Sequence, residues 1–217
     1  MAHRVAKGLV GGCAVLLGVT VTGCGAPQYT YVANSSASTY FKVPYGWHKI
    51  SDNALSAALK ADTGSSGGGW TVAYEAGTKP AAGDFLNFGT DHPYVFAEVG
   101  TLSSTASSEL SYDTLRDFFL PVTSTARQNA SQQGFPLTGF AQIRDETLTP
   151  GQGVHGVRET FDYTASGQAD TFDMDALTNA DQTEVYLLVI HCTTSCYSNY
   201  QTEINDVMSS FTVRSSS

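Results

Sequence analysis

The stretch Glu184-Val-Tyr-Leu-Leu-Val-Ile-His-Cys192-Thr-Thr-Ser-Cys196 decides the fold, because the hydrophobic pattern changes its period across it. Residues 185–190 form a continuous apolar run of strand length, rich in branched side chains, which is typical of a strand covered on both faces. After Cys196, apolar residues recur at the spacing of an amphipathic helix: Tyr200, Ile204, Val207 and Phe211. The sequence therefore predicts a buried strand that leads through a cysteine-bounded turn into a helix, and this unit is the centre of the domain.

Further strands are predicted upstream of this unit. Three precede it directly and are joined by turns rich in Gly, Pro and Asn: 140–148, 154–163 and 171–177. Shorter strands are predicted earlier in the chain, at 40–43, 70–75 and 94–99. A small helix follows Ser51, and a longer one runs from Ser111 to Gly134 with a kink or break at Pro121. This order indicates an α+β fold, an antiparallel sheet of about six to seven strands with helices packed on its faces.

Aromatic residues are concentrated in two of these segments. Six of them are predicted to fill the core: Tyr40, Phe41, Tyr45, Trp47, Phe118 and Phe119.

The predicted strand at 171–177 has two different faces. Its apolar residues Phe172, Met174 and Ala176 point one way, and Asp173 and Asp175 point the other. Asp173 and Asp175 could supply oxygen ligands for calcium together with three further carboxylates, those of Asp162, Asp170 and Asp181. Because the spacing lacks the glycine turn and the terminal glutamate of an EF-hand loop, a solvated acidic sheet face is the favoured interpretation.

Residues 1–23 have the pattern of a bacterial lipoprotein signal peptide. A short basic start precedes residues 8–21, an apolar run too short and too glycine-rich for a comfortable transmembrane helix. The following Val21-Thr-Gly-Cys24 resembles the lipobox, in which Cys24 receives fatty acyl chains such as palmitate and becomes the mature N-terminus. Two other interpretations stay open, an ordinary signal peptide cut elsewhere and an uncleaved anchor.

The residues after Cys24 are small and polar and show no apolar periodicity. They predict a flexible tether over 24–38, in which Tyr29 and Tyr31 rest at the membrane, contact a partner or are simply exposed. The chain carries 11 basic and 20 acidic residues, a net charge of −9, which becomes −11 once Arg4 and Lys7 leave with the signal peptide. Such a charge opposes direct binding to nucleic acid.

The chain has four cysteines, of which two would remain after processing. Cys13 leaves with the signal peptide and Cys24 takes the lipid, so that Cys192 and Cys196 are left in a compartment where disulfides persist. A structural disulfide is the favoured interpretation. Two alternatives stay open: a soft-metal site that includes His191, and an exchangeable dithiol at a helix N-terminus.

The sequence contains no local pattern of a known enzyme. Its scattered histidines are not paired at metal-ligand spacing, and no serine lies in G-x-S-x-G: the histidines after the signal peptide are His48, His92, His155 and His191. A Ser-His-Asp site assembled from distant segments stays open. The sequence therefore predicts no catalytic residues, no cofactor and no metal site.

Two motifs at the ends of the predicted domain resemble a known family. They are Phe41-x-Val43-Pro44-x-Gly46-Trp47 near its start and Ser210-Phe211-Thr212-Val213 near its end. Together with the strand and helix between 184 and 211, they resemble the PsbP-like α/β/α sandwich, in particular the actinobacterial LpqN-type lipoproteins. The resemblance implies one such domain over 39–217, tethered to the outer face of the cell membrane and lacking established catalytic residues. It implies a function in binding a protein or an envelope component. Together with the lipobox and the lack of a catalytic pattern, this leads to the hypothesis of a non-catalytic lipoprotein that binds an envelope protein or a small apolar or glycan ligand; the alternative is a metal or thiol-redox accessory protein that uses Cys192 and Cys196.

Overall fold

The computed structural model describes residues 28–63, 69–83 and 87–214. The strands of the large sheet are β3 His48–Lys49, β4 Trp70–Glu75, β5 Tyr94–Thr101, β6 Thr138–Gly151, β7 Val154–Ala165, β8 Gln168–Thr178 and β9 Glu184–Thr193. A small sheet contains β1 Tyr29–Asn34, β2 Thr39–Pro44 and β10 Thr212–Val213. The helices are α1 Asp52–Thr63, α2 Ser104–Ser108, α3 Tyr112–Arg116, α4 Ser124–Gln132, α5 Thr194–Asn199 and α6 Gln201–Ser210.

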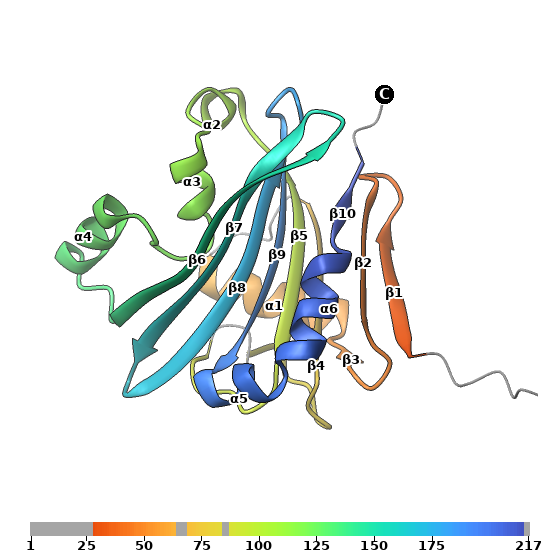
Figure 1. Cartoon of the computed structure of the whole chain (residues 1–217), viewed down its shortest axis with the longest axis vertical. Helices are drawn as coiled ribbons and strands as arrows, with labels where there is room; N and C mark the ends of the chain where they lie inside the picture. The colour runs from red at the N-terminus through yellow and green to blue at the C-terminus, as the bar shows by residue number, and fades with distance from the viewer. Residues whose placement is uncertain (1–27, 64–68, 84–86, 215–217) are drawn as a thin grey trace, which may run out of the picture.

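All strand pairs in both sheets are antiparallel. The large sheet has seven strands in the order β3-β4-β5-β9-β8-β7-β6, and the small one has three in the order β1-β2-β10 (Figure 1). The predicted α+β fold with an antiparallel sheet of six to seven strands is therefore confirmed.

The unit that contains β9, α5 and α6 lies at the centre of this arrangement, as the sequence predicts. β9 pairs with β5 on one side and β8 on the other, and residues 185–190 are buried. The Thr193 hydroxyl accepts a hydrogen bond from the Cys196 amide at 3.2 Å and so caps the start of α5. In α6, Ile204 and Val207 are fully buried against Leu188 and Ile190 of β9 and against β2.

Each face of the large sheet carries its own apolar layer. On one face, α6 and the small sheet cover β4, β5 and β9, and Phe41 and Trp47 are buried there as predicted. On the opposite face, Leu55 of α1 and Leu115 of α3 pack over a second cluster that includes Phe172. Figure 1 shows α6 in front of the sheet and α1 behind it. Among the described residues, no helix is long and apolar enough to cross a membrane.

The predicted tether over 24–38 is wrong from Tyr29 onward. Residues Tyr29–Asn34 form β1, whose register with β2 runs from Tyr29 opposite Pro44 to Asn34 opposite Thr39. The Tyr29 hydroxyl also donates a hydrogen bond to Asp206 of α6 at 2.7 Å, whereas Tyr31 is exposed. The tyrosines, the threonine and the valine of this segment favour a strand, and the small polar residues on either side conceal that preference. Residues 24–27 lie outside the described ranges, as do residues 1–23, for which a signal peptide is predicted.

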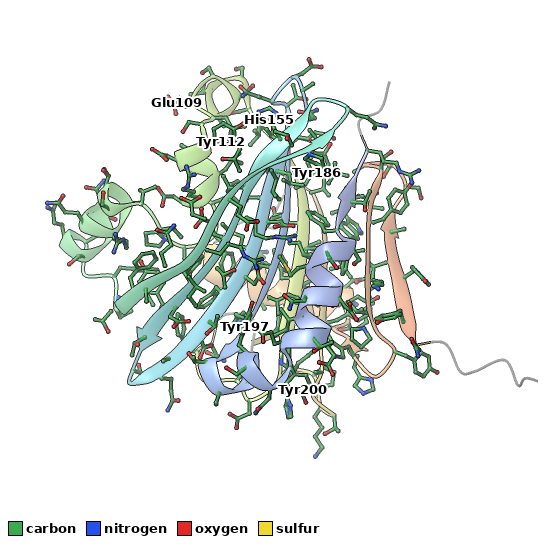
Figure 2. The ribbon with its side chains drawn as sticks, viewed as in Figure 1. Glu109, Tyr112, His155, Tyr186, Tyr197 and Tyr200 are labelled. Carbon is green, nitrogen blue, oxygen red and sulfur yellow. A yellow bond between two sulfur atoms is a disulfide. The ribbon has the colours of Figure 1, made fainter. Side chains whose placement is uncertain are left out.

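The predicted solvated acidic face of β8 is also wrong. Asp173 and Asp175 are only 1% and 2% exposed, and Asp170 on the opposite face is fully buried. The alternation itself is as predicted, but α5 and α6 cover the acidic side. Tyr197, which Figure 2 labels on α5, donates a hydrogen bond from its hydroxyl to Asp173 at 2.9 Å, and the Arg158 Nε donates one to Asp175 at 2.6 Å. Buried carboxylates need such partners, and here they come from other elements.

The predicted helix from Ser111 is broken near Pro121, as expected. The Asp117 carboxylate accepts hydrogen bonds from the amides of Val122 at 2.7 Å and Thr123 at 2.8 Å, which fixes the bend between α3 and α4. The core prediction fails in this segment, because Phe118 is 36% exposed and Phe119 is only half-buried. Tyr45, in the turn after β2, is exposed rather than buried.

Candidate functional site

A cavity of about 640 Å³ lies on the face of the large sheet that α1 and α3 cover. Its volume is within the range of small-molecule sites, which is about 300–1,000 Å³. Three neighbouring strands form its floor with these residues: Phe96 and Glu98 of β5, Leu187 and His191 of β9, and Phe172 of β8. The walls come from Leu59 of α1, the segments 118–120 and 135–137, the β7–β8 turn and residues 87–88.

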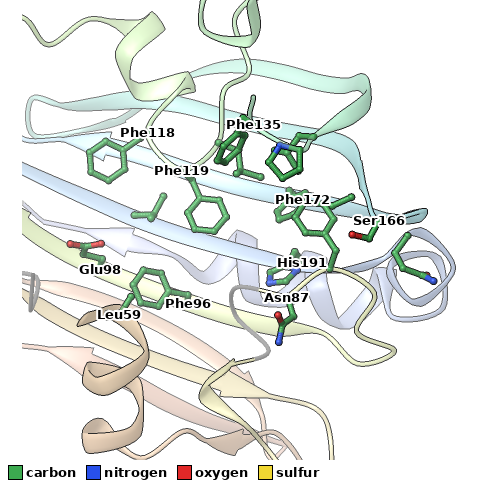
Figure 3. A pocket seen from close by; sticks show the side chains of 17 residues that line it. Leu59, Asn87, Phe96, Glu98, Phe118, Phe119, Phe135, Ser166, Phe172 and His191 are labelled. Carbon is green, nitrogen blue, oxygen red and sulfur yellow. The ribbon is translucent and has the colours of Figure 1, made fainter. Parts of the chain in front are cut away.

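Phenylalanine rings dominate the lining of this cavity. Phe172 stacks on Phe161 with 5.4 Å between ring centroids and on His191 with 5.0 Å. The ring of Phe119, in the α3–α4 connection, lies 6.2 Å from the ring of Phe172, centroid to centroid. Figure 3 shows the Phe119 ring between the two sides of the cavity. The floor is therefore a rigid aromatic surface that suits an apolar group.

Two further phenylalanines lie where the cavity opens. Phe118 and Phe135 are 36% and 49% exposed, although both side chains are large and apolar. They belong to the segments before and after α4, a helix with no buried residue. An exposed aromatic pair beside an apolar cavity is typical of an entrance that a ligand or a partner covers.

The polar groups in the cavity floor are few. The carboxyl of Glu98 is partly buried among apolar side chains, and this desolvation raises its pKa. His191 is almost fully buried and its Nδ1 lies 3.4 Å from the Asp170 carboxylate, which also accepts a hydrogen bond from the Gly89 amide at 2.9 Å. Asp170 therefore orients the imidazole ring in the cavity wall.

The buried pair of Asp170 and His191 supplies two members of a dispersed Ser-His-Asp arrangement. Ser166 lines the same cavity. A nucleophile and its base need a hydrogen bond between the serine hydroxyl and the imidazole ring, and the polar contact that the structure gives for the His191 ring is the one with Asp170.

Cys192 and Cys196 form a disulfide with their Cα atoms 5.9 Å apart. Both sulfurs belong to buried residues, and attack by an external thiolate requires access. Because successive residues of a strand point to opposite faces, His191 faces the cavity while Cys192 faces the other side, where it is bonded to Cys196 of α5. The structure therefore does not bring His191 to the two cysteines as the metal alternative requires. Among the described residues, no group of three or more His, Cys, Asp or Glu side chains is placed to hold a metal.

Sequence reasoning did not identify the cavity. Its floor residues have the spacing of ordinary buried strands, and their pattern does not reveal whether a neighbour fills the space above them. Two signals were nevertheless present. Glu98 interrupts an otherwise apolar strand, and apolar side chains occur at both ends of the loop-rich segment around α4: Phe118, Phe119, Leu120, Phe135 and Leu137.

The chain matches no protein-family model, and no curated protein matches it. It is similar in fold to the solution structure of cyanobacterial PsbP (CyanoP) from Synechocystis, with 13% identity, 94% of this chain and 99% of that chain covered, and a TM-score of 0.53. LpqN of Mycobacterium tuberculosis, described as involved in cell envelope biogenesis, has 15% identity, 87% and 91% coverage and a TM-score of 0.46. The likeness to CyanoP shows that this chain has a PsbP-like fold, and at this identity it shows the fold alone.

Proposed function

We propose that this chain is a non-catalytic lipoprotein of the outer face of a bacterial cell membrane that binds a small apolar ligand. The observation that carries the proposal is the cavity of about 640 Å³ with its floor and entrance of phenylalanine rings. Such a lining favours an apolar group over a bare glycan, which would need more hydrogen-bonding side chains than the five that line the cavity: Asn87, Glu98, Ser166, Gln168 and His191. An envelope protein that covers Phe118 and Phe135 is the alternative occupant of the entrance.

The proposed membrane anchor is the acylated Cys24. Its support is the basic start, the apolar run of residues 8–21 and the lipobox-like Val21-Thr-Gly-Cys24. Because the folded domain begins by Tyr29, only residues 25–28 separate the lipidated cysteine from β1. The five steps from Cys24 to Tyr29 span at most about 18 Å when fully extended, so the domain would be held against the lipid headgroups.

Acylation of Cys24 is checked by intact mass spectrometry of the mature protein from membranes. We expect an N-terminus at Cys24 with the added mass of at least two acyl chains. In a Cys24→Ser variant the acyl mass is expected to be absent, because serine lacks the thiol that takes the first acyl-bearing group. A mature wild-type protein without acyl mass would exclude this mode of attachment.

Binding in the cavity is checked with a neutral apolar fluorophore, N-phenyl-1-naphthylamine. Leu120→Trp adds a large side chain to a half-buried position of the cavity wall and is expected to weaken binding at least about tenfold, since it occupies the ligand's volume. The matched control is Ile143→Trp, which makes a similar change at an exposed position of β6 outside the cavity. Equal affinity in the two variants, with the Leu120→Trp protein folded, would place the binding elsewhere.

A further inference from the structure

A second hollow of about 370 Å³ adjoins the cavity and has a different chemistry. The two share Phe135 and Leu137 in their walls. The second hollow is lined by Arg127 of α4, by Tyr163 of β7 and by the start of β6. An apolar chamber thus continues into a smaller space that contains a cation.

Arg127 has no anionic partner in the part of the chain that the structure describes. Its guanidinium lies over the ring of Phe140, 4.0 Å from the centroid, and its buried Nε makes no hydrogen bond. Three other arginines each pair with at least one carboxylate: Arg116, Arg144 and Arg158. In a chain with 20 acidic and 11 basic residues, an unpaired buried guanidinium nitrogen calls for an explanation.

The polar groups around Arg127 are already engaged with one another. The Asp117 carboxylate accepts hydrogen bonds from the Val122 and Thr123 amides and from the Thr123 hydroxyl. The Tyr163 hydroxyl donates a hydrogen bond to the Pro121 carbonyl, and burial raises the pKa of Tyr163 to about 12, so this phenol stays neutral. The donors of Arg127 are therefore the groups that an incoming anion would meet.

We propose that the ligand is an anionic amphiphile whose carboxylate or phosphate head binds Arg127 and whose apolar tail passes Phe135 and Leu137 into the aromatic cavity. This inference rests on the proposed function and names the class of ligand for the same site. The planar guanidinium presents two parallel donors, which match the oxygens of either head group. Its stacking on Phe140 holds the plane in place, so less side-chain freedom is lost on binding.

The test compares three ligands with the same twelve-carbon chain in competition with N-phenyl-1-naphthylamine. In the wild-type protein, dodecanoate and dodecyl phosphate are expected to bind at least about tenfold more tightly than dodecanol, because a desolvated charged hydrogen bond is worth at least ~1.4 kcal/mol. Arg127→Gln is expected to remove this preference and leave dodecanol binding unchanged, and Arg127→Lys to retain part of it. Tighter binding of dodecanoate indicates a ligand with a carboxylate head, and tighter binding of dodecyl phosphate indicates one with a phosphate head.

The matched control is Arg144→Gln, which removes an arginine of β6 that lines neither hollow. It is expected to keep the preference for anions. If dodecanol binds as tightly as the two anions in the wild-type protein, or if Arg127→Gln keeps the anion preference, the subsite is excluded while the apolar cavity stands. If neither dodecanol nor the fluorophore binds the wild-type protein, the proposed function fails as well.

Discussion

Replacing Arg158 with methionine is expected to destabilise the fold by about 3–5 kcal/mol at pH 7. The Arg158 side chain lies on β7 and binds Asp175 of β8 through two nitrogens, Nε at 2.6 Å and Nη2 at 2.5 Å. The same Nη2 donates to the Met208 carbonyl of α6 at 3.0 Å. One guanidinium therefore joins two strands to the end of a helix, where a positive charge also favours the helix dipole.

The cost arises because Asp175 would lose its partner inside the protein. Burial raises the pKa of Asp175 to about 6 even though the Arg158 guanidinium acts in the opposite direction, and the buried Asp173 lies two residues away on the same face. Without the guanidinium, Asp175 must take up a proton or stay charged and unpaired, and either state disfavours folding. The measurement is the free energy of unfolding in urea.

Two further variants separate this explanation from simple loss of packing. The double variant Arg158→Met/Asp175→Leu is expected to recover most of the stability, because it removes both charges from the interior. Lys49→Met breaks an exposed pair with Asp52 at 2.8 Å, away from Asp175, and is expected to cost less than about 1 kcal/mol. If the double variant is as unstable as Arg158→Met, the unpaired carboxylate is not the cause.

The same pair of strands shows how far the sequence predicts this fold. The alternation of Phe172 and Met174 with Asp173 and Asp175 correctly divides β8 into two faces. It does not indicate which faces are covered, because that depends on the position of α5 and α6. It also cannot place Arg158 opposite Asp175, because this contact follows from the β7–β8 register. Local periodicity is visible in the sequence, but the burial of a charge is decided by distant elements.

The cavity escaped prediction for a related reason. Phe118 and Phe119 are as hydrophobic as core residues. Hydrophobicity does not distinguish a side chain that fills the core from one that lines a cavity, as these two do. The broken helix at Pro121 was predictable, since proline cannot continue the hydrogen-bond pattern. The direction of the break was not predictable, because it is set by the hydrogen bonds that the Asp117 carboxylate accepts from the first two amides after the proline, those of Val122 and Thr123. The break leaves α4 away from the core and exposes Phe135 at the entrance.

Glu159 of β7 is a second buried carboxylate whose charge depends on distant elements. It is fully buried beneath α3 and accepts hydrogen bonds from Arg116 Nε at 3.1 Å and from Gln142 Nε2 at 3.0 Å. Arg116 is shared with Asp113 at 3.0 Å and Asp145 at 2.9 Å. Burial, together with the neighbouring Asp145, raises the pKa of Glu159 to about 7, because one guanidinium does not compensate three carboxylates.

The protein is therefore expected to be less stable at pH 8 than at pH 5. A carboxyl whose pKa is raised on folding gives its full contribution below the unfolded value near 4.5, and this contribution is lost as the pH rises through about 7. The shift corresponds to ~3 kcal/mol. The raised pKa of Asp175 acts in the same direction at lower pH, whereas the lowered pKa of Asp145, caused by Arg116, affects stability only below its ordinary value of 3.8.

Glu159→Gln isolates this contribution, because glutamine resembles the protonated side chain at every pH. The free energy of unfolding in urea is measured at pH 5 and at pH 8. Its decrease between these two pH values is expected to be ~3 kcal/mol smaller in the variant than in the wild type. The control is Glu146→Gln, a half-exposed carboxylate on the neighbouring strand β6, which should keep the wild-type dependence on pH. A wild-type protein that is equally stable at both pH values, or a Glu159→Gln variant with the wild-type slope, would show that Glu159 is ionised at little cost in the fold. In that case Arg116 would be sufficient to compensate all three carboxylates around it.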